Sequence, residues 1–308
     1  MRESEPVIFK KYDKMNIKII IKFMVLYVTV FGNGCAQKSN SAKEEWLQLF
    51  NGKDLSDWHI KIAGHEQNEN FKNTFKIDSG ILKANYAEYS EFGNNYGHIY
   101  YKTPFSYYKL KVEYRFTGNQ IPGGAVWNVR NSGVMFHSQP PQTLSLNQGF
   151  PVSLEVQFLG GLSDGKPRTT ANLCTPGTMI EMNGNLNTEH CINSNSKTYD
   201  GDQWVTVEII VLGDSLIQHI VDKQVVLAYN KPRVGEVGAM KNYFLDKWGA
   251  QNEGMLLKEG YIALQAESHP VEFRKVELLN LKGCMNPKCP EYKSYFIVQG
   301  DCKCQSKP

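Results

Sequence analysis

A long series of short apolar segments constrains the fold more than any other feature of this chain. Runs such as "YYKLKVEYRF", "SLEVQFLGG" and "WVTVEIIVLG" either alternate apolar with polar side chains or are continuously apolar over the length of a strand. Gly, Asn, Asp and Pro separate these runs at distances typical of hairpins. Only "VGAMKNYFLDKWG" has a helical character. We therefore expect an all-β protein built as a sandwich or barrel of antiparallel strands.

The strand series is not interrupted by a repeat, a low-complexity tract or a linker, so residues 46–281 are expected to form one domain. A chain of 308 residues with 41% hydrophobic side chains can bury a full core. The net charge is only +3, and no basic stripe or nucleic-acid motif is present. We expect no nucleic-acid partner.

The N-terminal segment resembles a targeting signal. From Met15 the sequence "MNIKIIIKFMVLYVTVFGNGC" gives a short basic start, an apolar run and small residues that end at Cys35. This order is typical of a bacterial lipoprotein signal, although a glycine stands where Leu is usual. A membrane-spanning helix is the less favoured alternative, because the run is short and contains a lysine. We expect residues 1–35 to be the leader, with a true start at Met15, and residues 36–45 to be a tether. Lipidated Cys35 would then be the membrane anchor of an extracytoplasmic protein at the periplasm or outer-membrane surface.

The cysteine count agrees with this location. Of seven cysteines, six remain when Cys35 is set aside, which allows three disulfides. Cys174 and Cys191 flank a polar loop and are predicted to pair. A four-thiolate zinc site is the alternative for the other cysteines, but CxxC pairs are missing and an exported protein favours disulfides. The Cys-rich segment 282–308 is therefore expected to hold two disulfides of open pairing among Cys284, Cys289, Cys302 and Cys304.

Polar side chains interrupt three of the apolar strands at alternating positions. In "SLEVQFLGG" the carboxyl group of Glu155 and the amide of Gln157 point to one face, because strand side chains alternate. A solvated sheet face would give the same alternation. Solvated strands commonly use Lys and Thr, however, and these three contain no Lys. If the strands are neighbours, one sheet face would carry His137, Glu155, Gln157, Gln265, Glu267 and His269.

Several motifs occur together in a specific order. They are "LFNGKDLSDWHIK" at 49–61, "FKIDSGILKA" at 75–84, "RNSGVMFHSQ" at 130–139, "SLEVQFLGG" at 153–161 and "GYIALQAESHPVEFRKVELLNL" at 260–281. This series resembles the signatures of the 3-keto-disaccharide hydrolase domain family, which is abundant in Bacteroidetes lipoproteins. The resemblance covers nearly the whole chain after the leader. It implies a concanavalin A-like jelly-roll sandwich of two antiparallel sheets, one of them with a concave carbohydrate-binding face. It also implies cleavage of glycosides whose sugar carries a ketone at carbon 3.

The implied reaction defines which groups the site needs. A ketone at carbon 3 acidifies the hydrogen on carbon 2, so a base can form an enolate that expels the glycosidic oxygen before water adds back. Glu155, His137 and Glu267 are the candidates for proton transfer. A divalent cation or clustered donors could hold the developing oxyanion, but the spacing of the His and Glu residues identifies no metal ligands.

The remaining polar residues are candidates for binding the substrate, which we expect to be an oligosaccharide or another glycoside. Some of them precede a strand, where loop residues reach a ligand but where ordinary turns use the same residue types. The candidates for substrate binding are Gln157, Gln265, His269, Arg130, Asn131 and His98.

Two other functions remain open on the same fold, because sandwiches support many activities. One is a non-catalytic lectin that uses the concave face only to bind sugar. The other is a conventional glycosidase with two carboxyl groups. The ExDxxE pattern of retaining β-glucanases is not present, since Gln157 and Gly160 stand where the second and third acids would follow Glu155.

Overall fold

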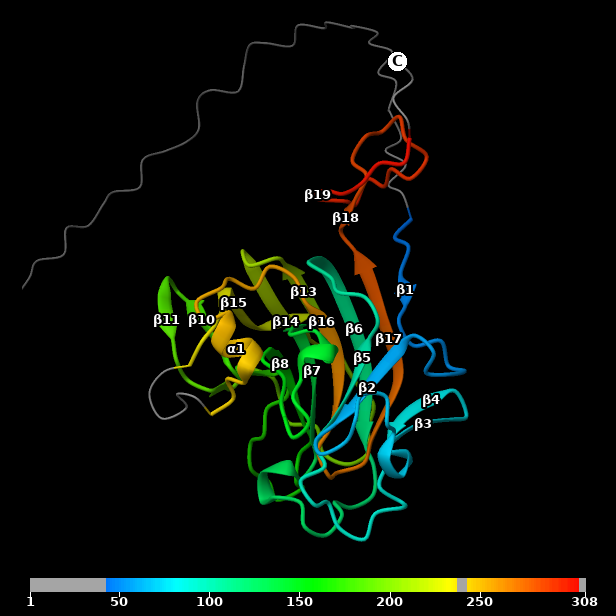
Figure 1. The fold of residues 1–308 in the computed structure, drawn as a ribbon, viewed down its shortest axis with the longest axis vertical. Helices are drawn as coiled ribbons and strands as arrows, with labels where there is room; N and C mark the ends of the chain where they lie inside the picture. The colour runs from blue at the N-terminus through cyan, green and yellow to red at the C-terminus, as the bar shows by residue number, and fades with distance from the viewer. Residues whose placement is uncertain (1–42, 237–242, 305–308) are drawn as a thin grey trace, which may run out of the picture. The chain divides into compact units, whose positions relative to one another are not determined.

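Two large antiparallel sheets contain most of the regular structure (Figure 1). The computed structural model describes residues 43–236 and 243–304, so the predicted leader, Cys35 and most of the predicted tether lie outside the described residues. Within the described ranges, no helix has both the length and the apolar character that a membrane span requires.

The first sheet has ten strands in the order β11-β10-β15-β14-β13-β6-β17-β4-β3, with β1 paired to β17. Alternation is complete in β6, where every second side chain is buried, because one face packs on the core and the other meets solvent. The strands are β1 (Leu47–Gln48), β3 (Phe75–Asp78), β4 (Ile81–Ala84), β6 (Tyr107–Phe116), β10 (Thr178–Met182), β11 (Asn185–Asn187), β13 (Val205–Leu212), β14 (Leu216–Val221), β15 (Gln224–Val234) and β17 (Val271–Asn280).

The second sheet has seven strands in the order β12-β9-β8-β7-β16-β5-β2. Its central strands are buried on both faces; in β7 all eight residues are buried. The face of this sheet that points away from the core is therefore covered as well, and the functional candidates lie on that face. The strands are β2 (Trp58–Ile62), β5 (Gly97–Tyr101), β7 (Asn131–Ser138), β8 (Leu154–Leu159), β9 (Asn172–Cys174), β12 (Cys191–Ile192) and β16 (Tyr261–Ala266).

Helical structure is limited to single turns among the described residues. The 3-10 turns are η1 (Phe71–Asn73), η2 (Val126–Asn128) and η3 (Pro141–Thr143). The one α-helix among the described residues, α1 (Lys247–Gln251), overlaps only the last three residues of the segment with helical character, and residues 243–246 of that segment are not helical. It begins after Asp246, whose side chain accepts a hydrogen bond from the backbone N–H of Gly249.

The core lies between the two sheets, where the apolar faces of their strands pack together. The rings of Tyr114 on β6 and Phe158 on β8 are parallel across this interface, with centroids 4.1 Å apart. Both rings are fully or almost fully buried. The prediction of an all-β, concanavalin A-like jelly-roll sandwich with two antiparallel sheets is therefore confirmed.

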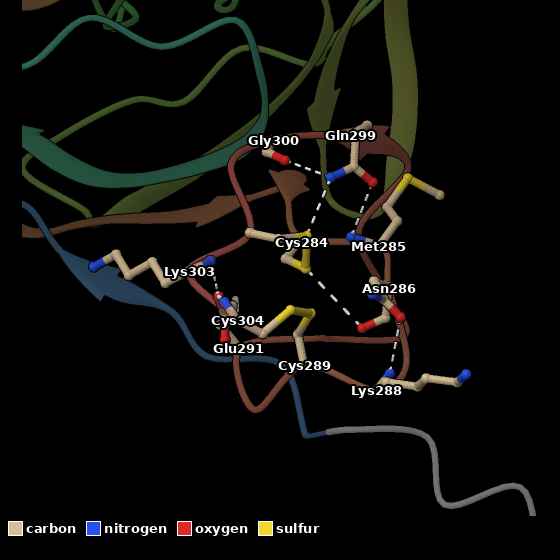
Figure 2. Close-up of a disulfide and its surroundings, with 11 residues drawn as sticks. Cys284, Met285, Asn286, Lys288, Cys289, Glu291, Gln299, Gly300, Lys303 and Cys304 are labelled. Carbon is tan, nitrogen blue, oxygen red and sulfur yellow. Dashed lines mark hydrogen bonds between the residues drawn. A yellow bond between two sulfur atoms is a disulfide. The ribbon is translucent and has the colours of Figure 1, made fainter. Parts of the chain in front are cut away.

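Six cysteines form three disulfides. Cys174 on β9 is bonded to Cys191 on β12, as predicted, and the two residues are direct partners in the strand register. The C-terminal segment contains the bonds Cys284–Cys302 and Cys289–Cys304, and Figure 2 shows the second of these bonds. They hold a small parallel pair of strands, β18 (Lys282–Gly283) and β19 (Val298–Gln299). The pairing that the sequence left open is thus assigned.

Candidate functional site

Strand β8 presents Glu155 and Gln157 on the face of the seven-stranded sheet that points away from the core. The intervening Val156 belongs to the core between the sheets, so alternation places the two polar side chains opposite it. Glu155 is in register with Met135 on β7, and Gln157 is in register with Gly133. The polar pair therefore lies near the middle of the sheet, between two neighbouring strands.

A cavity of about 1120 Å³ lies over this face. Its floor includes Asn131, Glu155 and Gln157 from the sheet, and Glu267 from the end of β16. A cavity of this size is at the upper end of the range for small-molecule sites. Its walls come mainly from loops and include Tyr96, Val126, Trp127, Phe150, Leu162 and Phe244.

The position of the Glu155 carboxyl group depends on a glycine in the neighbouring strand. A Cβ atom at Gly133 would lie only 2.5 Å from Oε1 of Glu155. The carboxyl group therefore occupies the space that a side chain on β7 would otherwise fill. A glycine inside a strand commonly marks such a close approach, so "SGVMF" carried a signal for this site that sequence analysis did not use.

The two buried carboxyl groups influence each other electrostatically. Burial raises the pKa of Glu155 above its ordinary value. Burial also raises the pKa of Glu267, and the negative charge of Glu155 raises it further. Because a charge on one carboxyl group disfavours ionisation of the other, the pair favours a state that holds a single proton. Two carboxyl groups with separated pKa values can act as a base and an acid in one reaction.

Several buried polar atoms of the seven-stranded sheet and of Glu267 have no hydrogen-bond partner among the described residues, although His98 and Gln265 are not among the residues that line the cavity. Both ends of the Gln265 amide, Nε2 of His98, Oδ1 of Asn131 and Oε2 of Glu267 belong to this set. Gln265 is in register with His98 on the neighbouring strand β5. Burial lowers the pKa of His98 to about 3, so its imidazole is neutral. Because buried polar groups are normally hydrogen-bonded, this concentration indicates a site for a polar ligand.

His137 does not join the other candidates. The register between β7 and β16 shifts near this residue, and His137 has a backbone φ of +46°. Such an irregularity ends the strict alternation of a strand, which was the basis for placing His137 beside Glu155. Its Nε2 lies 3.0 Å from the carbonyl oxygen of Gly213, in the turn between β13 and β14 of the other sheet, and its ring lies near the core ring of Phe136. The expectation that His137 shares the face of Glu155 is wrong.

His269 and Arg130 also lie outside the lining of the cavity. Ser268 has a backbone φ of +72°, which interrupts the alternation after Glu267, and the ring of His269 packs edge-on against Phe116 of the opposite sheet. The guanidinium group of Arg130 pairs with Asp202 at 3.1 Å. The expectation that His269 shares a face with Glu267 is therefore wrong for the same physical reason as for His137.

Aromatic side chains from three loops form much of the wall. The rings of Tyr96 and Trp127 are nearly parallel, with centroids 6.0 Å apart, and the ring of Phe150 lies 4.8 Å from that of Tyr96. Tyr96 and Phe150 are not among the candidates that the sequence provided. Loop residues carry no periodicity that shows where they fold, so no pattern in the sequence identified this wall.

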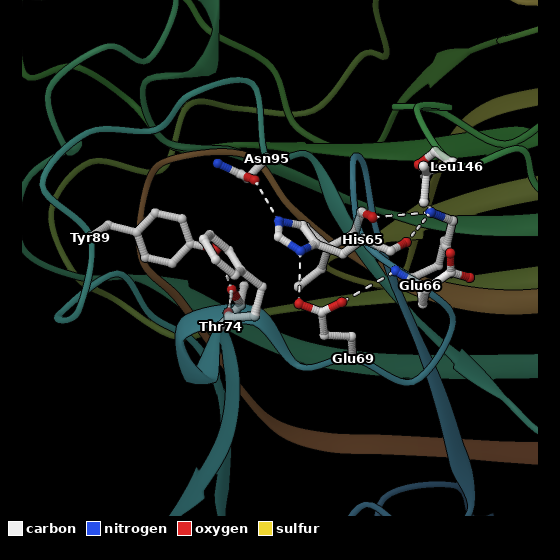
Figure 3. Close-up of polar contacts among 10 residues, drawn as sticks. His65, Glu66, Glu69, Thr74, Tyr89, Asn95 and Leu146 are labelled. Carbon is white, nitrogen blue, oxygen red and sulfur yellow. Dashed lines mark hydrogen bonds and ion pairs between the residues drawn. The ribbon is translucent and has the colours of Figure 1, made fainter.

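A polar network holds the loop that carries Tyr96 (Figure 3). Nδ1 of His65 lies 2.9 Å from a carboxylate oxygen of Glu69, and its Nε2 lies 3.2 Å from Oδ1 of Asn95. The buried Lys61 ammonium donates to the carbonyl oxygens of Leu146 and His65. His65 is thus a structural anchor for the cavity wall, and it does not line the cavity.

The fold and this site together define a class: a jelly-roll sandwich with an acidic pair in a pocket on one sheet. The chain belongs to the family of 3-keto-alpha-glucoside-1,2-lyase-like domains, whose sequence model matches residues 45–279. No protein of curated function matches the chain.

Solved structures of similar topology are distant in sequence. Two are described as a "putative glycosyl hydrolase" from Parabacteroides distasonis. They are 16% and 17% identical, each with a TM-score of 0.45, and the matches cover 77% of this chain and 100% and 94% of theirs. A Bacillus subtilis protein of unknown function with a galectin-like fold is 14% identical, with a TM-score of 0.44 and coverage of 77% and 97%.

Proposed function

We propose that this protein cleaves the glycosidic bond of 3-keto-glycosides by elimination followed by hydration. The observation that carries the proposal is the buried pair Glu155 and Glu267, which line one pocket and whose pKa values are both raised by burial. The reaction needs a base and an acid on one substrate, and this pair supplies both. Membership of the 3-keto-glucoside lyase-like family supports the same reaction.

The residues take the following roles in this proposal. Ionised Glu155 removes the proton from carbon 2, and the electrons of that C–H bond form an enolate with its negative charge on the ketone oxygen. The ketone then re-forms, and the same electrons make a double bond between carbons 1 and 2. The bond from carbon 1 to the glycosidic oxygen breaks, and neutral Glu267 gives its proton to the departing oxygen. Water then adds across the double bond, with its hydroxyl group on carbon 1 and a proton on carbon 2. The products are a 3-keto sugar and a free alcohol.

The unpartnered polar atoms would bind the sugar. The Gln265 amide group is a buried donor without a partner among the described residues, so it can stabilise the oxyanion that develops from the ketone. Gln157, Asn131 and neutral His98 are the further candidates for contacts with the hydroxyl groups. The bound sugar would supply the hydrogen-bond partners that Nε2 of His98 and Oδ1 of Asn131 lack among the described residues. No step in this scheme requires a metal ion.

A conventional glycosidase is the second candidate, because that mechanism also uses two carboxyl groups near one bond. It acts on sugars that are not oxidised, whereas the elimination requires the ketone. A lectin would bind sugar without cleaving it. The choice of substrate therefore separates the three functions.

The test is incubation of the purified protein with a glucosyl-glucose disaccharide and with its 3-keto derivative. We expect product from the oxidised sugar only. Glu155→Gln keeps the shape of the side chain and removes the base, so turnover should fall by on the order of a hundredfold or more while circular dichroism stays unchanged. Glu259→Gln is the matched control, since Glu259 is exposed. Cleavage of the unoxidised sugar would support the glycosidase, and binding without cleavage of either sugar would support the lectin.

We further propose that the protein works outside the cytoplasm, anchored by a lipid on Cys35. The signal-like sequence before Cys35 motivates this location, and three disulfides agree with an oxidising compartment. Cells that express the chain should incorporate a labelled fatty acid into it, and Cys35→Ser should abolish the label. Equal labelling of both proteins would contradict the anchor.

A further inference from the structure

The mouth of the cavity differs chemically from its floor. Val126 is 90% exposed, Trp127 is 54% exposed and Leu162 is 46% exposed, and all three line the cavity. Val126 and Trp127 belong to η2, and Leu162 comes from a separate loop, so two segments bring exposed apolar surface to this cavity. Exposed apolar side chains that gather around a pocket mark a binding surface, whereas isolated ones need no explanation.

The charged side chain of the lining outside the floor is occupied by the protein itself. Arg168 lines the cavity, but its guanidinium group donates to the carbonyl oxygens of Val129, at 2.7 Å, and Gly160, at 2.5 Å. The ring of His190 is stacked on Phe244 with centroids 4.8 Å apart. A second sugar ring placed here would bring several hydroxyl groups that lose their water, and the remaining polar side chains of the lining outside the floor include Asn94, His190 and Tyr243. Hydroxyl groups left without a partner weaken binding.

The cavity also extends well beyond a single sugar ring. A pyranose that reaches Glu155 and Glu267 occupies the polar floor, and a volume of about 1120 Å³ leaves a compartment between that ring and the opening. Trp127 and Phe150, whose centroids are 6.5 Å apart and whose planes are 37° apart, face this region together with aliphatic Leu162. Aromatic faces and edges bind other aromatic rings favourably.

We propose that the preferred substrate carries an aromatic aglycone as its leaving group, held at the mouth of the cavity, and not a second sugar. This inference rests on the proposed function, because the polar floor must take the 3-keto sugar. To the proposed reaction it adds the chemical class of the leaving group. Val126, Trp127, Phe150 and Leu162 would contact the aglycone, while the acid and base act on the bond beneath it.

The test compares two substrates of the same anomeric configuration, 2-phenylethyl 3-ketoglucoside and the 3-keto derivative of a glucosyl-glucose disaccharide. Phenylethanol is no better a leaving group than a sugar hydroxyl group, so faster cleavage reports recognition. We expect kcat/KM to be at least about tenfold higher for the phenylethyl compound. Leu162→Asn should lower that value by about fivefold to tenfold and lower the value for the disaccharide by less. Leu186→Asn is the matched control, because Leu186 is similarly exposed, at 49%, and lies outside the cavity lining.

A binding measurement separates this inference from the proposed function. Titration calorimetry of the Glu155→Gln variant with each 3-keto compound gives Kd without turnover, and the phenylethyl compound should bind at least about tenfold more tightly. Equal or tighter binding of the disaccharide, or an equal effect of Leu162→Asn on both ligands, would overturn the aromatic aglycone. Tighter binding of the phenylethyl compound without cleavage of either substrate by the native protein would support the recognition and contradict the proposed reaction.

Discussion

At the scale of single residues, the outcome of the sequence predictions depended on local backbone conformation. Alternation placed Glu155 and Gln157 on one face because β8 is regular there. The same rule failed for His137 and His269, because His137 and Ser268 have positive φ angles that a sequence does not reveal when the residue is not glycine. Roles that rest on alternation alone are therefore predictable only within regular strands.

The raised pKa of Glu155 makes a prediction about stability. Below the ordinary value of 4.5, both the folded and the unfolded chain carry this proton. As the pH rises, the unfolded chain releases the proton first, so the folded state loses stability progressively until the pH passes the raised pKa. Glu155→Gln removes this loss. Its melting temperature should match that of the native protein near pH 4 and exceed it by a few degrees near pH 9.

Thermal unfolding followed by circular dichroism at a series of pH values measures this difference. Glu259→Gln should give no such trend, because Glu259 is exposed. A lower melting temperature for Glu155→Gln at every pH would show that Glu155 contributes to folding through contacts that the amide cannot replace.

At the scale of secondary-structure elements, most of the strands were predictable from the sequence, but the bounds of the short helix and the pairing of the strands were not. Hydrophobic alternation identified segments such as β6 and β13 directly. The partners of each strand come from distant parts of the chain, as for β6 between β13 and β17, and alternation carries no information about such pairing. The jelly-roll arrangement followed only from the family resemblance.

The contact between β7 and β8 gives a second prediction. In Gly133→Ala the new methyl group would lie 2.5 Å from Oε1 of Glu155 and would push the carboxyl group out of position. We expect kcat/KM for a 3-keto-glycoside to fall by at least about tenfold, because a small displacement of a base is costly in catalysis. The far-ultraviolet circular dichroism spectrum should stay unchanged. Full activity of this variant would contradict the proposed role of the carboxyl group.

At the scale of the whole molecule, three disulfides cross-link the chain. Two of them lie in the C-terminal segment after the sandwich, and one joins β9 to β12. We predict that a thiol reagent applied without reductant labels none of these six cysteines, and that it labels all six after reduction and unfolding. Mass spectrometry of the labelled chain gives the count. Labelling before reduction, or a retained zinc ion, would contradict this assignment.

The Cys174–Cys191 bond lies directly beside the candidate base, since Cys174 is in register with Glu155 and both cysteines line the cavity. This position has a practical consequence for anyone who produces the protein. A chain made in a reducing host, or kept in buffer with dithiothreitol, would have a pocket wall without its covalent link and could be recorded as inactive. Secretion into an oxidising compartment, followed by assay without thiols, is the preparation in which the substrates should be tried.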